Sequence, residues 1–473
     1  MNDRDSAARE QVAAQVAELV GRARSAQAVA EHYDQRRVDE LVAAAGWAIL
    51  EPGRNRALAE LAVADSGIGN VPDKIRKNHR KTLGLLRDLK GALSVGVIAE
   101  QADRGLVEIA RPVGVVCAVT PSTNPAATPA NKIINALKCR NAVIVAPSPK
   151  GWRTAAALIA HIHEQFDRIG APRDLVQVLP SPVGKAVTLE LMRQCDLVVA
   201  TGSQANVRAA YASGTPAFGV GAGNVASIID ETADPERAVA LVLQSKTFDN
   251  ATSCSSENSL VVVAAARPAV LAALARQGAP LLSAEHKARL QQLMWPDGHL
   301  SPAVIGQSAA LIAERAGFPG LEQARALVVD ETECGPGFPF SGEKLSPVLT
   351  LYTVPDFAAA ADTVRRIYAH QGAGHSVSLH SEVADRALAL GLWLPVSRVI
   401  VNQAHAVATG GSFDNGLPFS LSMGCGTWGN NNFSDNMNYR HYMNVTRIAR
   451  PIPERVPTED EIFGTFFSKY GRA

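Results

Sequence analysis

One cysteine in the chain stands in a setting that suits a nucleophile. Cys254 lies in a small polar segment, residues 247–257, directly ahead of the apolar run at 260–264. A thiol becomes a nucleophile only as its thiolate, which needs access and nearby hydrogen-bond donors. A turn rich in Ser, Thr and Asn before a strand supplies both. On these residues alone, a buried structural cysteine is the competing interpretation.

The other cysteines indicate neither a metal site nor a disulfide framework. The six cysteines are scattered at long intervals, without a Cys-x-x-Cys or His-Glu-x-x-His pattern. Cys117 sits inside the apolar run at 115–119, and Cys195 just precedes the run at 197–200. We therefore expect both in the core.

Composition indicates an ordinary globular protein of two or three domains. The chain has 473 residues, of which 47% are hydrophobic and 19% are charged. A formal net charge of +1 gives no electrostatic reason to expect nucleic acid or an anionic membrane as partner. The chain starts with polar residues, and no apolar run approaches the ~20 residues of a membrane span. We expect a cytoplasmic protein.

Apolar runs alternate with helical stretches along the first half of the chain. Residues 9–50 are predicted helical from their three- and four-residue apolar spacing. Strands are predicted at 106–110, 114–119, 142–146, 175–179 and 197–200, and helices at 131–138, 152–168, 184–193 and 203–212. Near-continuous apolar strands separated by helices predict an α/β fold with a doubly wound, mostly parallel sheet.

Donor-rich turns follow three of these strands. Ligands of such sheets bind beyond the carboxyl ends of the strands, so these turns suit phosphates and a nicotinamide ring. The same residue types also make ordinary helix caps, which is the alternative. The dinucleotide pattern Gly-x-Gly-x-x-Gly is missing, because its nearest match, residues 219–224, ends in Asn224. The residues concerned are Thr120, Pro121, Asn124, Ser148, Lys150, Thr201, Gly202 and Ser203.

Several segments together resemble the aldehyde dehydrogenase superfamily over nearly the whole chain. They are Asn124 in Pro-Ser-Thr-Asn-Pro, the turn at 201–203, the Gly-rich turn before 228–230, Cys254, and Glu343 in Glu-Lys-Leu-Ser-Pro-Val. Closer detail at 248–250, 343–347, 374–376 and 423–429 resembles the branch of that superfamily that acylates coenzyme A.

The resemblance implies an NAD(P)-dependent enzyme with three parts, assembled as a homodimer or homotetramer. The cofactor domain would span 1–98 and 113–230, the catalytic domain 231–430, and the oligomerisation element 99–112 with 431–473. Cys254 would attack the aldehyde and carry the acyl group as a thioester, while Asn124 would stabilise the oxyanion. Residues implied at the cofactor are Thr120, Pro121, Ser148, Lys150, Thr201, Gly202, Ser203, Gly221 and, at the ribose, Glu343.

One departure from the superfamily bears on the product. Members that release free acids carry Glu-Leu-Gly-Gly-Lys before the catalytic domain, and that Glu activates water. Residues 219–223 contain no carboxylate here. Water is a poor nucleophile without a positioned base, whereas a thiol ionises far more easily and attacks a thioester readily. Coenzyme A is therefore the expected acyl acceptor. Glu257 is an alternative base, although a surface glutamate is its commoner explanation.

The remaining assignments concern the substrate side and the choice of cofactor. Pro149 stands where related NAD-selective sequences often have Glu, and Ser148 and Lys150 suit a 2'-phosphate, so NADP is expected and NAD is the alternative. The resemblance implies sulfoacetaldehyde as the aldehyde, with succinate semialdehyde and acetaldehyde as alternatives. A sulfonate needs several hydrogen-bond donors. Candidate donors to the substrate or CoA are His375, His405, Asn431 and Arg440.

Structural explanations remain for several of these residues. A histidine beside glycine, such as His375, is more often a structural hydrogen-bonder, and Cys425 between two glycines indicates close backbone packing. Two other functional classes stay open. A hydrolytic aldehyde dehydrogenase conflicts with the missing Glu, and a non-catalytic protein on the same fold conflicts with the presence of both Cys254 and Asn124.

Overall fold

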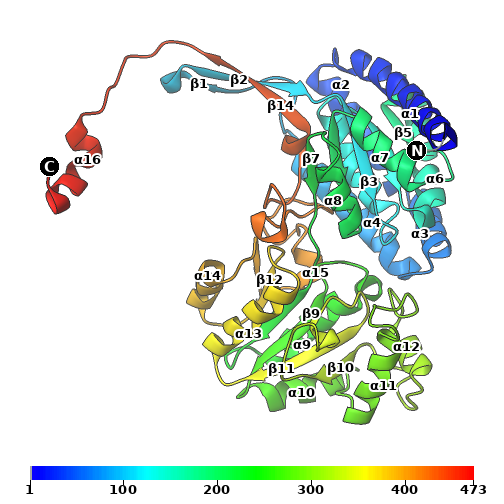
Figure 1. The fold of residues 1–473 in the computed structure, drawn as a ribbon, viewed down its shortest axis with the longest axis vertical. Helices are drawn as coiled ribbons and strands as arrows, with labels where there is room; N and C mark the ends of the chain where they lie inside the picture. Colours follow the sequence, from blue (N-terminus) through cyan, green and yellow to red (C-terminus); the bar gives the residue numbers. More distant parts are fainter. Residues whose placement is uncertain (1–2, 473) are drawn as a thin grey trace.

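Two α/β lobes and a projecting arm make up the protein, a computed structural model that describes residues 3–472 (Figure 1). The first lobe is built on a five-stranded parallel sheet in the order β5-β4-β3-β6-β7. Its strands are β3 (Val115–Thr120), β4 (Ala142–Pro147), β5 (Val176–Val178), β6 (Leu197–Ala200) and β7 (Ala217–Gly219). The predicted doubly wound sheet is confirmed, with strand bounds within about two residues.

Helices cover this sheet on both faces. Strands β3, β4 and β6 are buried along their whole length, because apolar side chains on both sides pack against helices. The segment predicted as helical at 9–50 forms two helices, with a break between Ala30 and Gln35. Asp34 caps the second helix, because its side chain accepts from the N–H of Arg37 at 2.7 Å. The helices are α1 (Asp3–Ala30), α2 (Gln35–Leu50), α3 (Pro52–Ser66), α4 (Val71–Leu89), α5 (Ala127–Lys138), α6 (Trp152–Ile169), α7 (Lys185–Gln194) and α8 (Gln204–Tyr211).

The second lobe holds a six-stranded parallel sheet in the order β10-β11-β9-β8-β12-β13. Its strands are β8 (Val225–Ile229), β9 (Glu257–Val263), β10 (Leu327–Asp330), β11 (Val348–Val354), β12 (Val377–His380) and β13 (Val399–Val401). Its helices are α9 (Pro235–Thr247), α10 (Arg267–Arg276), α11 (Ala284–Met294), α12 (Ala309–Arg315), α13 (Phe357–His370), α14 (Ala384–Trp393) and α15 (His405–Ala408).

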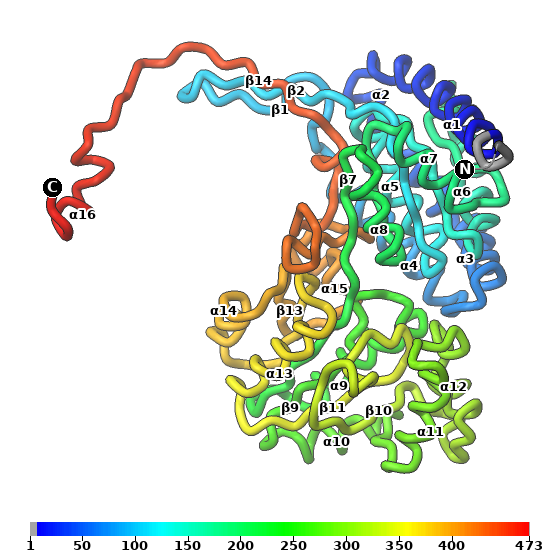
Figure 2. The backbone as a smooth tube through the Cα atoms, in the orientation of Figure 1, coloured from blue at the N-terminus to red at the C-terminus, as the bar shows by residue number. Residues whose placement is uncertain are grey.

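Strand β8 pairs with β9 and β12, so residues 225–229 belong to the second sheet and not to the cofactor domain that we expected to reach residue 230. Both sheets use buried apolar strands, and nothing local in such a strand says which sheet it joins. The chain passes between the lobes directly after β7 and returns through residues 405–440 (Figure 2).

The arm is a three-stranded antiparallel sheet in the order β1-β2-β14. It consists of β1 (Gly96–Gln101), β2 (Leu106–Pro112) and β14 (Met443–Ala449), and the chain then runs out to α16 (Glu459–Tyr470), away from both lobes (Figure 1). Within the described residues, no helix has the length and apolar character needed to cross a bilayer.

Candidate active site

A cavity of about 490 Å³ gathers ten of the residues singled out from the sequence. It opens at the carboxyl ends of β3, β4 and β6 and is closed from the second lobe by the loop before β9. This is the edge of a parallel sheet where ligands bind. The ten residues are Thr120, Pro121, Asn124, Ser148, Thr201, Gly202, Ser203, Gly221, Cys254 and Glu343.

Cys254 is carried into this cavity by a sharp turn in the backbone. Three consecutive residues, none of them glycine, adopt left-handed φ values: Asp249 at 52°, Asn250 at 53° and Ala251 at 60°. Such conformations are strained outside glycine and persist only where the surroundings hold them. Here the side-chain amide of Asn250 donates from Nδ2 to the carbonyl of Gly306 at 3.0 Å. The turn thus fixes the loop that bears the thiol.

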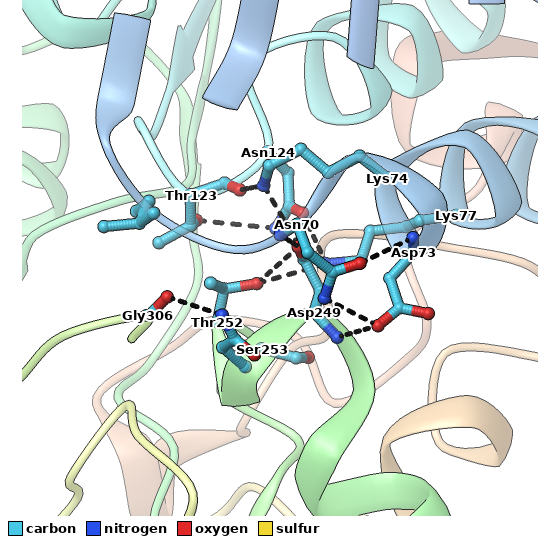
Figure 3. A network of polar contacts seen from close by, with 12 residues as sticks. Asn70, Asp73, Lys74, Lys77, Thr123, Asn124, Asp249, Thr252, Ser253 and Gly306 are labelled. Carbon is cyan, nitrogen blue, oxygen red and sulfur yellow. Dashed lines mark hydrogen bonds and ion pairs between the residues drawn. The ribbon is translucent and has the colours of Figure 1, made fainter. Parts of the chain in front are cut away.

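Asn124 is held by a buried ionic network that reaches it from α4 (Figure 3). Lys77 Nζ donates to Asn124 Oδ1 at 2.7 Å and to Asp249 Oδ2 at 2.6 Å. Lys74 Nζ donates to the same carboxylate oxygen at 3.1 Å. Although burial acts in the opposite sense, these two cations hold the pKa of Asp249 below its usual value. The amide nitrogen of Asn124 donates to Thr123 Oγ1 at 3.4 Å and keeps a second N–H for an oxyanion.

His375 lies beside the nucleophile. Its Nε2 is 3.5 Å from Cys254 Sγ, and its Nδ1 is 2.6 Å from Ser376 Oγ. Burial, with the nearby charge of Arg398, lowers the pKa of His375 well below its usual value, so the imidazole is neutral at pH 7. Burial, with the nearby Glu343, raises the pKa of the Cys254 thiol to about 12. The resting thiol is therefore protonated at pH 7, and Nε2 of neutral His375 lies within hydrogen-bond distance of it.

The cavity has a single carboxylate. Glu343 lines it without a hydrogen bond or ion pair to its carboxylate among residues 3–472, and burial raises its pKa to about 8. The turn that supplies a glutamate in hydrolytic relatives of the superfamily lines the cavity as Val220, Gly221, Ala222 and Gly223. A Cβ on Gly223 would lie 2.0 Å from the backbone oxygen of Cys254, so this glycine allows the two segments to meet.

Glu257 is not the surface residue that we expected. It is fully buried, and the hydroxyl of Ser245 donates to its carboxylate. Burial raises the pKa of Glu257 to about 7. Because it does not line the cavity that holds Cys254, it is not positioned to activate water there.

None of the four substrate-side candidates lines this cavity, and of them only His375, which is fully buried, contacts the nucleophile. His405 is buried with Nδ1 2.8 Å from the carbonyl of Ser255, so it supports the loop. Asn431 accepts the N–H groups of Gly221 and Cys425 at 3.0 and 2.9 Å, tying two turns together. Arg440 is exposed in a different cavity. In this segment Asn431 therefore stabilises turns.

Lys150 and three further cysteines were also singled out from the sequence. Lys150 does not line the cavity, although Ser148 does. Cys425 packs against glycines as expected, since a Cβ on Gly374 would lie 1.9 Å from the Cys425 carbonyl oxygen. Cys117 and Cys195 are buried in the first core, as predicted. No cluster of ligands suited to a metal ion occurs among the described residues.

Sequence reasoning missed the lysines of α4 and also Arg398. The guanidinium of Arg398 is buried and donates to the carbonyls of His375 and Gly424 at 3.2 and 2.9 Å. A signal for the lysines exists in the sequence. Lys74, Lys77 and Lys81 share one helical face with the buried Leu85, a place where basic side chains are unusual.

Comparison with known proteins identifies the family of the chain. Residues 6–287 match the model of the aldehyde dehydrogenase family. The chain belongs to that family. It is 66% identical to sulfoacetaldehyde dehydrogenase (acylating) of Cupriavidus necator over 97% of this chain and 93% of that one. It is 41% identical to the enzyme of the same name from Bilophila wadsworthia, over 97% and 99%.

A solved structure confirms the fold of this family member. The crystal structure of an acetylating aldehyde dehydrogenase from Geobacillus thermoglucosidasius superposes with a TM-score of 0.91 at 36% identity, covering 95% of this chain and 99% of that one. The two chains therefore share one fold over nearly their whole lengths.

Proposed function

We propose that the protein oxidises sulfoacetaldehyde with NADP and coenzyme A to sulfoacetyl-CoA. The observation that carries the acylating reaction is a cavity lined by Cys254 and Asn124, with neutral His375 in contact with Cys254 and no carboxylate on the turn at 220–223. The substrate rests on the high identity to relatives named as acylating sulfoacetaldehyde dehydrogenases.

The first half of the reaction forms the thioester. His375 accepts the Cys254 proton through Nε2 when its own proton resides on Nδ1, where Ser376 Oγ accepts it. The thiolate adds to the aldehyde carbon, and the amide N–H of Asn124 and the backbone N–H of Cys254 stabilise the oxyanion. When bound, the nicotinamide ring supplies the hydride acceptor that oxidises this adduct to an acyl thioester.

The second half transfers the acyl group to coenzyme A. Once the proton taken from Cys254 has passed to solvent, His375 takes the proton of the incoming thiol, whose sulfur attacks the thioester carbon, and Cys254 leaves as a thiolate that regains this proton from His375. Water competes poorly because the cavity lining lacks a base on the 220–223 turn. The resemblance implies that Glu343, which lines the cavity, would contact the ribose of the bound cofactor.

The residues of the cavity suit a dinucleotide. Thr120 Oγ1 is buried and has no partner among the described residues, and Ser148, Thr201 and Ser203 offer further hydroxyls along the strand ends. Pro149 and not an acid follows Ser148 after β4, and Lys150 is exposed beside it. An acid that would repel a 2'-phosphate is missing at that position, which favours NADP over NAD.

Assembly and location complete the proposal. We expect a homodimer or homotetramer formed through the arm, because β1 and β14 are the edges of its sheet and Phe463, Phe466 and Tyr470 are exposed on α16. All six cysteines are free thiols, which suits the reducing cytoplasm.

The test is a panel of kcat/KM measurements with saturating CoA. Sulfoacetaldehyde, succinate semialdehyde and acetaldehyde are compared with NADP and with NAD. We expect sulfoacetaldehyde with NADP to give the highest value. A tenfold preference for acetaldehyde would refute the substrate, and a strong preference for NAD would refute the cofactor.

A further inference from the structure

A second cavity, of about 290 Å³, lies against α4 and is lined by Lys77, which also bonds to Asn124. Its other walls come from the end of α9, from Phe248 and from α15. Its charged lining is strongly one-sided, with five basic side chains and one acidic. These are Arg76, Lys77, Arg80, Lys81, Arg325 and Asp73.

Arg80 and Lys81 in this cavity have no ion pair among the described residues, whereas Lys77 pairs with Asp249 and Arg76 with Asp73. Arg80 donates to the carbonyls of Val407 and Gly411 and to Ser412 Oγ, and it has no carboxylate within ion-pair distance. Lys81 Nζ donates to the carbonyl of Gly410 at 2.7 Å. Burial lowers the pKa of Lys81 to about 7. A bound anion would supply the counter-charge that these desolvated cations lack.

The cavity adjoins the reacting centre through Lys77. Lys77 Nζ is 2.7 Å from Asn124 Oδ1 and 3.2 Å from Thr252 Oγ1, two residues before Cys254. The opposite side of the Cys254 cavity is formed by the strand ends that suit the cofactor. An aldehyde between Cys254 and Asn124 whose free end is turned away from the strand ends would point toward α4. In a two-carbon sulfonate the anionic group lies within about 5 Å of the carbonyl carbon.

We propose that the basic cavity under α4 recognises the anionic group of the substrate, with Arg76 and Arg80 attracting a sulfonate toward Lys77 and the reacting carbon. This inference rests on the proposed function, since it assigns residues to the aldehyde named there. It places the recognition of the anion on α4, while the amide-rich segment at 430–441 has a structural part. A coenzyme A phosphate has related chemistry, so the experiment separates the two ligands.

The test compares Arg76→Gln and Arg80→Gln with wild type. Arg76 is 68% exposed in its side chain and pairs only with Asp73, at 3.3 Å, so its replacement leaves the packing intact. The matched control is Arg193→Gln on α7, which is 62% exposed and pairs with Glu190 at 3.5 Å with the same i,i+3 spacing. Arg80 also anchors the loop at 407–412, so thermal unfolding accompanies its kinetics.

The readout is the ratio of kcat/KM for sulfoacetaldehyde to that for acetaldehyde. We expect it to fall roughly tenfold or more in Arg76→Gln and to stay at the wild-type value in Arg193→Gln, because a charged hydrogen-bond partner is lost. Raising the salt concentration lowers the same ratio in wild type. An unchanged ratio in both cavity variants overturns the inference. A raised KM for CoA with an unchanged ratio also overturns it and assigns the cavity to CoA.

A non-reacting sulfonate keeps this test apart from that of the proposed function. Isethionate, 2-hydroxyethanesulfonate, is added while acetaldehyde is turned over. We expect competitive inhibition against acetaldehyde in wild type, and at least tenfold weaker inhibition in Arg76→Gln. If wild type prefers acetaldehyde yet isethionate inhibits in this way, the substrate is wrong and the cavity assignment stands. Equal inhibition of both proteins, or none, refutes the cavity assignment.

Discussion

The ammonium group of Lys77 lies 2.7 Å from the side-chain oxygen of Asn124. Lysine can only donate, so this contact fixes the amide of Asn124 with its oxygen toward α4 and its nitrogen toward the cavity. An oxyanion donor must be oriented before the charge develops, since reorientation during the reaction costs rate. Lys77 and its partner Asp249 are therefore positioning residues for the oxyanion site.

Replacing Lys77 by Met removes that orientation. With acetaldehyde as substrate, we expect kcat/KM to fall by about 10- to 100-fold, because one oxyanion donor is then poorly aimed. In an Asn124→Ala background the same replacement should cost less than about threefold, since a residue acting through Asn124 has nothing left to orient. Fully additive losses in this cycle would show that Lys77 acts independently of Asn124. Thermal unfolding is measured alongside, because Asp249 keeps only Lys74 as its ion-pair partner.

Removal of the nucleophile and removal of the oxyanion donor should affect enzyme activity differently. Cys254→Ala should abolish aldehyde oxidation while the cofactor still binds, because no thioester can form. Asn124→Ala should retain the thioester route but lose about 10²-fold or more in kcat. Steady-state kinetics and cofactor titration by fluorescence check both. Near-normal turnover by Cys254→Ala would exclude the covalent mechanism.

The close approach of Gly223 to Cys254 predicts that a larger residue at position 223 displaces the catalytic loop. In Gly223→Ala the new Cβ meets the Cys254 carbonyl oxygen at 2.0 Å, so the catalytic loop must shift. We expect at least about a 10²-fold loss of kcat/KM, the scale of a misplaced reacting group. Gly391→Ala on α14, where nothing lies within 4 Å of the new Cβ, is the matched control and should keep full activity. Equal activities in the two variants would contradict the packing described here.

Acid should destabilise the protein partly through His380, at the end of β12. Burial, with the nearby Arg237, lowers the pKa of His380 to about 4. Between its unfolded pKa of about 6.5 and that value, the unfolded chain binds a proton that the folded chain does not, so stability falls as pH falls. In this range the free energy of unfolding falls by about 1.4 kcal/mol for each pH unit of acidification.

Denaturant unfolding at pH 7 and pH 5 measures this effect. Wild type should lose about 2 kcal/mol more than His380→Gln between the two values. The exposed His32→Gln is the control and should behave as wild type. A loss in His380→Gln as large as that of wild type would show that this histidine does not contribute.

Local patterns in the sequence were sufficient for most of the first lobe. Strands β3, β4 and β6 are continuous apolar runs bounded by turns, and such runs predict buried parallel strands nearly residue by residue. Sheet membership is not local, so β8 was expected in the wrong domain. The order of strands depends on packing between segments far apart in the chain.

The candidate site also has residues that local sequence patterns predict and residues that they do not. Residues in turns at strand ends, such as Thr120 and Ser203, meet at one cavity because parallel strands bring their carboxyl ends together. Lys77 was missed because its partners Asn124 and Asp249 are 47 and 172 residues away. Arg440 was chosen for charge and sequence proximity alone, and the chain carries it to another surface.

The most direct test of the account is product formation from sulfoacetaldehyde with and without coenzyme A. Pure protein is mixed with NADP and the aldehyde, and reduced cofactor, sulfoacetyl-CoA and free sulfoacetate are followed together. We predict steady formation of sulfoacetyl-CoA with CoA and at most a single-turnover burst of reduced cofactor without it, because the thioester on Cys254 cannot discharge to water. Steady release of sulfoacetate in the absence of CoA would contradict the acylating mechanism.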